Sequence, residues 1–203
     1  MVNGFTAVRT SGSIDIEVMN NENQTIRIEA DDNILPYIIT RVDDGMLDVR
    51  YRSNMMFNNT HVKVYVSTPS LKKLIVGGSG SIISKDVLKE QDEIELKVSG
   101  SGDIDAIVDA PSVTAGIGGS GTISLHGKTK NFTCSVGGSG DIKCKELLSE
   151  STNVSVSGSG TAHVFASVHL VAKVSGSGDI YYSGNPSSPE IHTSGSGSVE
   201  AEK

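Results

Sequence analysis

Aromatic side chains are scarce in this chain of 203 residues: they supply 4% of it, and tryptophan is absent. This scarcity excludes a core organised around large rings and leaves stacked, medium-sized aliphatic side chains as the core material. Arginine is also scarce, and its five copies all occur by residue 52. With a net charge of −7, the chain lacks the concentrated Lys/Arg surface that nucleic acid or an anionic membrane requires.

Cysteines and long apolar runs are few or missing. Only Cys134 and Cys144 are present, which excludes a disulfide scaffold and leaves no second pair for a zinc site. Both fall at positions expected to face inward, so they are either buried thiols or partners in a disulfide across one coil. No run of about 18 apolar residues encodes a membrane span. The first residues have no basic flank and no apolar segment, so either the protein is cytoplasmic or its signal peptide is missing from this sequence.

What the sequence does have is a repeat. Gly-Ser-Gly, followed by Ser, Thr or Asp and then an apolar residue, occurs seven times at intervals of 18 to 22 residues. The second glycines of the seven copies are Gly80, Gly102, Gly121, Gly140, Gly160, Gly178 and Gly197. Self-similarity at this period is typical of a solenoid, in which each unit buries its apolar face only against its neighbours.

Apolar residues alternate with polar ones on both sides of each glycine bend. This period of two predicts two strands per coil, joined by the bend, with columns of like side chains inside. Examples are Val98 and Ile104, four residues before and two residues after Gly102. We expect the glycines to provide positive φ angles and close approach of stacked backbones, and the hydroxyls of the central serines to bond to neighbouring coils.

The N-terminal part of the sequence has a different pattern. Four segments between residues 14 and 66 alternate apolar and polar residues without the glycine phrase, which predicts antiparallel strands with one face buried. We therefore predict an all-β protein with N-terminal antiparallel strands leading into a parallel β-helix-like solenoid of about seven coils. The expected division is a sheet region at 1–70 and a solenoid at 71–203, unless the two form one continuous unit. Met55, Met56 and Phe57 form either a small exposed patch or a partly buried one.

No catalytic, cofactor-binding or metal-binding motif is present. The glycine phrases lack the register of a dinucleotide fingerprint or a P-loop. A calcium-binding β-roll is also disfavoured, because Asp follows the second glycine only in alternate coils. The repeats contain no arginine, and their histidines fall at different offsets, so we expect no enzyme. Surface contacts are expected at Tyr181, either as part of a sugar-stacking platform with Tyr182 or in rim packing, and at the guanidinium groups of Arg50 and Arg52.

Several segments in order along the chain resemble one bacterial family. They are residues 4–8, 11–13, 30–38, 64–74, 174–180 and 182–186. The family is that of the auto-transporter adhesins with a head GIN domain, known mainly from Bacteroidetes. The resemblance implies an all-β fold with a parallel β-helix-like array, export beyond the inner membrane and an adhesive role, and it brings no catalytic residue.

These observations together predict a non-enzymatic β-solenoid, located in the cell envelope or outside the cell, that presents an extended surface to a glycan or protein partner. The alternatives are a structural envelope protein without a specific ligand and a lipid- or saccharide-binding module. We expect no cofactor. Charged residues near residue 200 should discourage end-to-end stacking, so a monomer or a side-by-side dimer is predicted.

Overall fold

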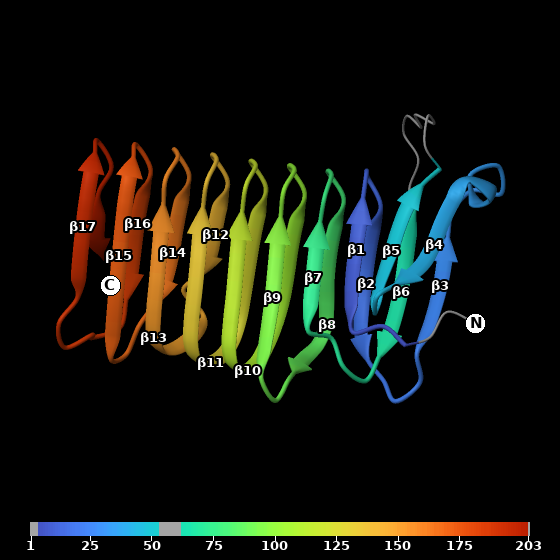
Figure 1. Ribbon diagram of the computed structural model, residues 1–203, viewed down its shortest axis with the longest axis horizontal. Helices are drawn as coiled ribbons and strands as arrows, with labels where there is room; N and C mark the ends of the chain where they lie inside the picture. The colour runs from blue at the N-terminus through green and yellow to red at the C-terminus, as the bar shows by residue number, and fades with distance from the viewer. Residues whose placement is uncertain (1–3, 53–61, 203) are drawn as a thin grey trace.

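The computed structural model describes residues 4–52 and 62–202, and Met55, Met56 and Phe57 therefore lie outside the described residues. The chain forms a β-solenoid in which strands stack along one axis in two layers (Figure 1). The tight bends all lie along one edge, which we call the crest, and the looser corners lie along the opposite edge, which we call the base. Strand is the dominant structure and helix is almost missing from the described residues, as the alternating pattern predicts.

Each coil runs down one layer after the bend and returns up the other. The strands of the first layer are β8 (Ser81–Lys89), β12 (Asp141–Cys144), β14 (Thr161–Phe165), β16 (Asp179–Ser183) and β18 (Val199–Ala201). The strands of the second layer are β7 (Lys73–Val76), β9 (Glu93–Val98), β13 (Leu147–Val156), β15 (His169–Gly176) and β17 (Glu190–Gly195). Two long strands, β10 (Asp103–Ile117) and β11 (Thr122–Val136), pass through both layers. All of these strands pair in parallel with their neighbours, so successive coils are in register.

The N-terminal strands combine two kinds of pairing. They are β1 (Ala7–Ser11), β2 (Asp15–Asn20), β3 (Thr25–Glu29), β4 (Ile38–Asp43), β5 (Met46–Tyr51) and β6 (Lys63–Thr68), with a short 3-10 helix η1 (Leu35–Tyr37). The pairs β3–β6 and β4–β5 are antiparallel, as expected. However, β1 pairs in parallel with β5 and β7, and β2 pairs in parallel with β6 and β8. Strands β1 and β2 thus form an additional coil, and a division at residue 70 stays a prediction.

The core is built from columns that take one side chain from each coil. The column two residues after the bend contains Ile82, Ile104, Ile123, Ile142, Ala162 and Ile180, each at most 1% exposed. A buried aliphatic side chain of this size stabilises the fold by about 1.5–3 kcal/mol relative to an exposed one. Cys134 and Cys144 lie in the same core as free, buried thiols, and burial raises the pKa of both.

Close approach, and not positive φ, explains the second glycine of each bend. A Cβ atom at Gly102 would meet the carbonyl oxygen of Gly80 and lie 2.7 Å from Cγ1 of Val76 in the preceding coil. The same two kinds of contact recur at Gly121, Gly140, Gly160, Gly178 and Gly197. None of the seven second glycines has positive φ, so that part of the expectation is wrong.

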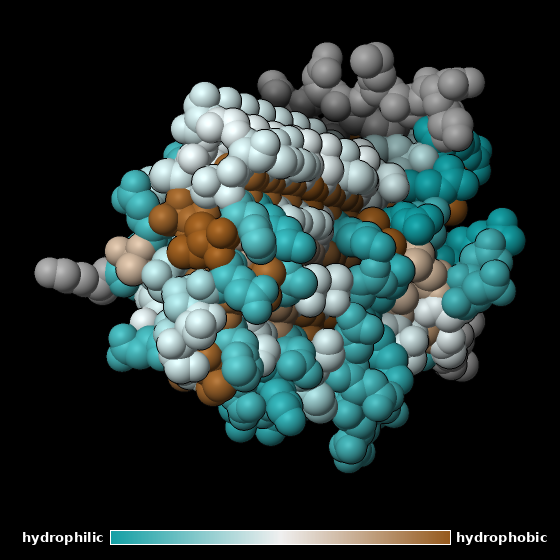
Figure 2. Space-filling view, turned by 60° about the vertical axis from the view of Figure 1, so that its left-hand side comes forward, coloured by the Kyte–Doolittle hydropathy of each residue, from teal (hydrophilic) through white to brown (hydrophobic). Residues whose placement is uncertain are grey.

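The central serines of the bends bond through their backbone and not through their hydroxyl groups. The amide of Ser101 donates to the carbonyl of Gly78 at 3.0 Å, and the amide of Ser120 donates to that of Gly100 at 3.0 Å. The side chains are exposed along the crest, where Figure 2 shows a pale ridge of small residues. Neighbouring bends are therefore joined by backbone hydrogen bonds, and not by the expected hydrogen bonds from serine hydroxyl groups.

Candidate functional site

One row of polar side chains crosses the outer face of the first layer. Asp105, Ser124, Lys143, His163 and Tyr181 occupy the same register position in five successive coils. Each lies three residues after a second glycine, so the strand period of two turns it away from the core. Neighbouring strands are about 4.8 Å apart, and the row therefore extends about 19 Å along the solenoid.

Hydrogen bonds and short polar contacts connect this row to side chains beside it. Nδ1 of His126 lies 3.1 Å from Oε2 of Glu146, and its Nε2 lies 3.9 Å from Oδ1 of Asp105. Nδ1 of His163 lies 3.3 Å from Oε2 of Glu202. His126 and His163 border one cleft of 400 Å³, together with Asp105, Ser124, Lys143, Lys145 and Glu146. Two histidines that seemed unrelated by their offsets thus meet at one surface.

Tyr181 stacks on His163, with ring centroids 4.9 Å apart and an angle of 18° between the planes. The imidazole covers one side of the phenol ring, so that side is closed to a sugar. Tyr182 is half-buried and packs against the core. A sugar platform made of both tyrosines is therefore not formed, and Tyr181 contributes to the outer face together with His163.

The arginines expected to make contacts lie at the other end of the solenoid, near β4 and β5 (Figure 1). Nε of Arg50 lies 3.0 Å from Oδ2 of Asp48, beside a cleft of 400 Å³ that also contains Arg9 and Arg41. Arg52 is exposed, and its amide donates to the carbonyl of Tyr37. The structure thus brings neither Arg50 nor Arg52 close to Tyr181.

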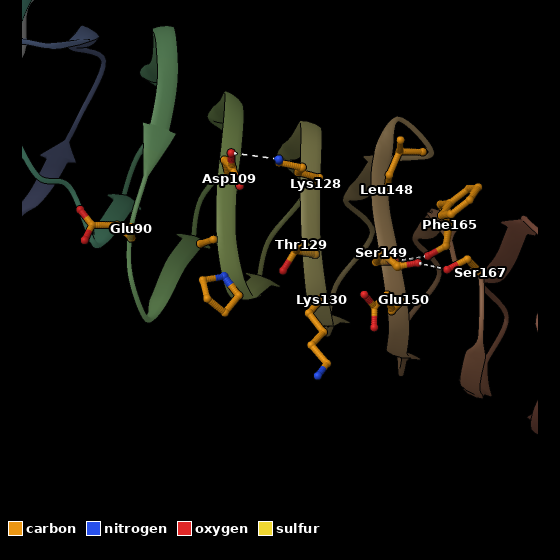
Figure 3. Close-up of a pocket in the computed structure, with 12 residues that line it drawn as sticks. Glu90, Asp109, Lys128, Thr129, Lys130, Leu148, Ser149, Glu150, Phe165 and Ser167 are labelled. Atoms are coloured by element: carbon orange, nitrogen blue, oxygen red, sulfur yellow. Dashed lines mark hydrogen bonds and ion pairs between the residues drawn. The ribbon is translucent and has the colours of Figure 1, made fainter.

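A third hollow, which the sequence did not reveal, lies at the base. This basal groove has a volume of 680 Å³ and is shown in Figure 3. Apolar side chains, among them Pro111, Leu148 and Phe165, alternate along it with charged ones such as Lys130 and Glu150. No signal in the sequence indicated it: Asp109 and Lys128 lie seven residues after their second glycines and Leu148 lies eight after its own, so only the pairing of the strands shows that the three share one register position.

None of these three hollows has the composition of a metal centre. Among residues 4–52 and 62–202, no group of three or more His, Cys, Asp or Glu side chains is placed to hold a metal ion. No helix in the same part of the chain is both long enough and apolar enough to cross a membrane. The charged groups of the outer face are suited to hydrogen-bonding a polar ligand.

The model of one protein family, described as "Putative auto-transporter adhesin, head GIN domain", matches residues 4–186. The chain belongs to this family. No curated protein sequence matches this chain. The chain also resembles three solved structures.

The first is described as an adhesin from Bacteroides fragilis, with 21% identity, a TM-score of 0.92 and coverage of 99% of this chain and 94% of that one. The second is described as a lipid-binding protein from Parabacteroides distasonis, with 25% identity, a TM-score of 0.80 and coverage of 100% and 94%. The third is described as an adhesin from Parabacteroides merdae, with 25% identity, a TM-score of 0.76 and coverage of 100% and 93%. The family and the fold support an adhesin-like, non-enzymatic protein.

Proposed function

We propose that this protein is a non-enzymatic adhesin of the cell envelope or the cell exterior, and that it presents the outer face of its first layer to a glycan. The observation that carries the proposal is the in-register row from Asp105 to Tyr181. Carboxylate, hydroxyl, ammonium and imidazole groups follow one another along a rigid sheet, and together they donate and accept hydrogen bonds. An extended polymer of sugars has complementary hydroxyl groups along its whole length.

Rigidity supports this function because the binding groups need no ordering when the ligand arrives. Every coil from β8 to β16 pairs on both sides. Hydrogen bonds to Glu146 and Glu202 hold the rings of His126 and His163 in place. A protein partner remains the alternative ligand for the same face. A structural envelope role without any ligand would give this face no binding activity.

A lipid-handling role is disfavoured by the shape and charge of the basal groove. One structural neighbour is described as a lipid-binding protein. In this chain, however, the groove is open to solvent, and both Lys130 and Glu150 stand at its rim. An acyl chain is better protected in an enclosed apolar cavity, where most of its surface is removed from water.

The test is binding of the full chain to an array of bacterial and host polysaccharides and host-matrix proteins. The double variant His163→Ala/Tyr181→Ala removes the stacked pair from the outer face. The matched control is His169→Ala/Lys173→Ala, which removes exposed side chains from the second layer. We expect the wild type to bind a glycan saturably. The first variant should bind it with an affinity at least about tenfold lower, and the control should keep the affinity of the wild type.

Three results would speak against the proposal. Equal binding by both variants would show that the ligand contacts another surface. Binding to proteins alone would replace the glycan by a protein partner. No binding at about 100 µM protein would favour the structural envelope role.

A further inference from the structure

The basal groove contains exposed apolar surface. Leu148 is 55% exposed, the highest value among the exposed large hydrophobic residues of the described chain. The equivalent positions in the two preceding coils hold Asp109 and Lys128, which form an ion pair of 3.5 Å. Burial of the exposed part of a leucine side chain is favourable, and Leu148 forgoes this gain. Its position beside half-buried Phe165 therefore indicates an apolar contact that another molecule can complete (Figure 3).

The wall of the groove is held in one conformation by hydrogen bonds. The hydroxyl groups of Ser149 and Thr152 both donate to the carbonyl of Phe165, the latter at 2.6 Å. The amide and the hydroxyl of Ser167 donate to the carbonyl of Ser149 at 3.0 and 3.1 Å. The groove is thus formed before any ligand binds, which removes one cost of association.

Two unpaired charges of opposite sign stand beside this apolar surface. Lys130 and Glu150 lie in adjacent coils, between the register pairs Thr129–Ser149 and Asn131–Ser151. Both are exposed, and within residues 4–52 and 62–202 neither forms an ion pair. An occupant that matches this rim must supply one charge of each sign next to an apolar group.

A polypeptide meets this requirement more readily than a lipid. A lipid with an anionic head brings nothing positive for Glu150. A zwitterionic lipid carries both charges, but its acyl chains would lie in a groove that is open to solvent. Neighbouring residues of a protein can carry a base, an acid and a single large apolar side chain. An apolar centre with a charged rim is also the usual anatomy of a protein interface, and its buried apolar anchors carry most of the binding energy.

We propose that the basal groove binds an extended segment of a partner protein. In this complex a large apolar side chain packs on Leu148 and Phe165, an acidic residue pairs with Lys130, and a basic residue pairs with Glu150. The site is separate from the outer face of the first layer, so the protein has a second binding surface besides the one proposed for glycans.

A phage-displayed library of random peptides of about 12 residues, selected on the full chain, tests this proposal. We expect the enriched peptides to share a large apolar residue flanked by one acidic and one basic residue. Binding of a synthetic peptide, followed by fluorescence polarisation, should weaken at least about tenfold in Leu148→Ser. The matched control is Leu35→Ser, which removes a leucine of 39% exposure from η1 and should leave binding unchanged.

A charge exchange makes the test more specific. The double variant Lys130→Glu/Glu150→Lys keeps the net charge and the apolar surface, so it should select peptides in which the acidic and basic flanks are reversed. Peptide affinity should not change in His163→Ala/Tyr181→Ala, which separates this result from that of the glycan experiment.

Two results would overturn the proposal. One is enrichment of peptides whose affinity is the same for the wild type and Leu148→Ser. The other is Leu148-dependent binding to phosphatidylglycerol or phosphatidylcholine vesicles without any selected peptide, which would assign the groove to lipid. Thermal unfolding followed by circular dichroism verifies that each variant is folded.

Discussion

Single glycines decide whether one coil can lie against the next. Replacing Gly102 with alanine should lower the free energy of unfolding by about 1–3 kcal/mol, because the new methyl group would collide with the carbonyl of Gly80 and with Val76. Gly116→Ala is the control, since its Cβ would approach nothing closer than Oγ of Ser135 at 3.6 Å. We expect the control to stay within about 0.5 kcal/mol of the wild type in urea unfolding. Equal losses in both variants would contradict a steric role for Gly102.

The two buried thiols give stability a dependence on pH. Burial raises the pKa of Cys134 and Cys144, whereas in the unfolded chain a thiol ionises near about pH 8.5. The contribution of the two protonated thiols to the free energy of unfolding is therefore complete below this pH. Above this pH the contribution falls, by up to about 1.4 kcal/mol per pH unit for each thiol, because only the unfolded state releases the protons.

Urea unfolding of the wild type and of Cys134→Ala/Cys144→Ala, measured between about pH 8 and about pH 10, tests this dependence. The free energy of unfolding should fall more steeply with pH in the wild type. Parallel curves for the two proteins would mean that the thiols do not titrate differently on unfolding.

At the scale of strands, the sequence determines which residues face inward more clearly than it determines how strands pair. Alternation of apolar and polar residues gave the two strands of each coil and the core columns, because a period of two has the same meaning in any sheet. For the same reason it could not distinguish parallel from antiparallel neighbours in β2, β5 and β6. The coil of β1 and β2 was missed because Ile14 stands where the later bends have their second glycine.

The candidate sites were harder to predict because offsets along the chain fail at the base. Strand β12 ends at Cys144, and a turn at Lys145 and Glu146 precedes β13. Beyond this turn, the number of residues from the second glycine no longer gives the register position of a side chain. His126 and His163 lie five and three residues after their second glycines, so the strand period of two turns both outward, and they border one cleft although their offsets differ. Tyr181 could be placed on the surface from its offset, but its stacking on His163 depends on the pairing of two strands in space.

At the scale of the whole molecule, the two ends of the solenoid differ. Strands β3 and β4 cross the N-terminal end as antiparallel neighbours of β6 and β5. At the other end, within the described residues, β17 pairs only with β15 and β18 only with β16. All of β17 is exposed, including Ile191 at 42%. Such an edge can template pairing with another chain unless charges oppose it.

Glu190 and Glu200 are the exposed acids on these edge strands, whereas Glu202 turns back toward Lys145 at 3.3 Å. We expect the wild type to stay a monomer or a side-by-side dimer, because end-to-end stacking would bury both edge carboxylates without partners. The variant Glu190→Thr/Glu200→Thr should form particles that lengthen with concentration in light scattering. Glu146→Thr/Glu150→Thr removes the same charge from the sides of the solenoid and should not. Growth of the wild type, or equal growth of the two variants, would show that the edge carboxylates do not control assembly.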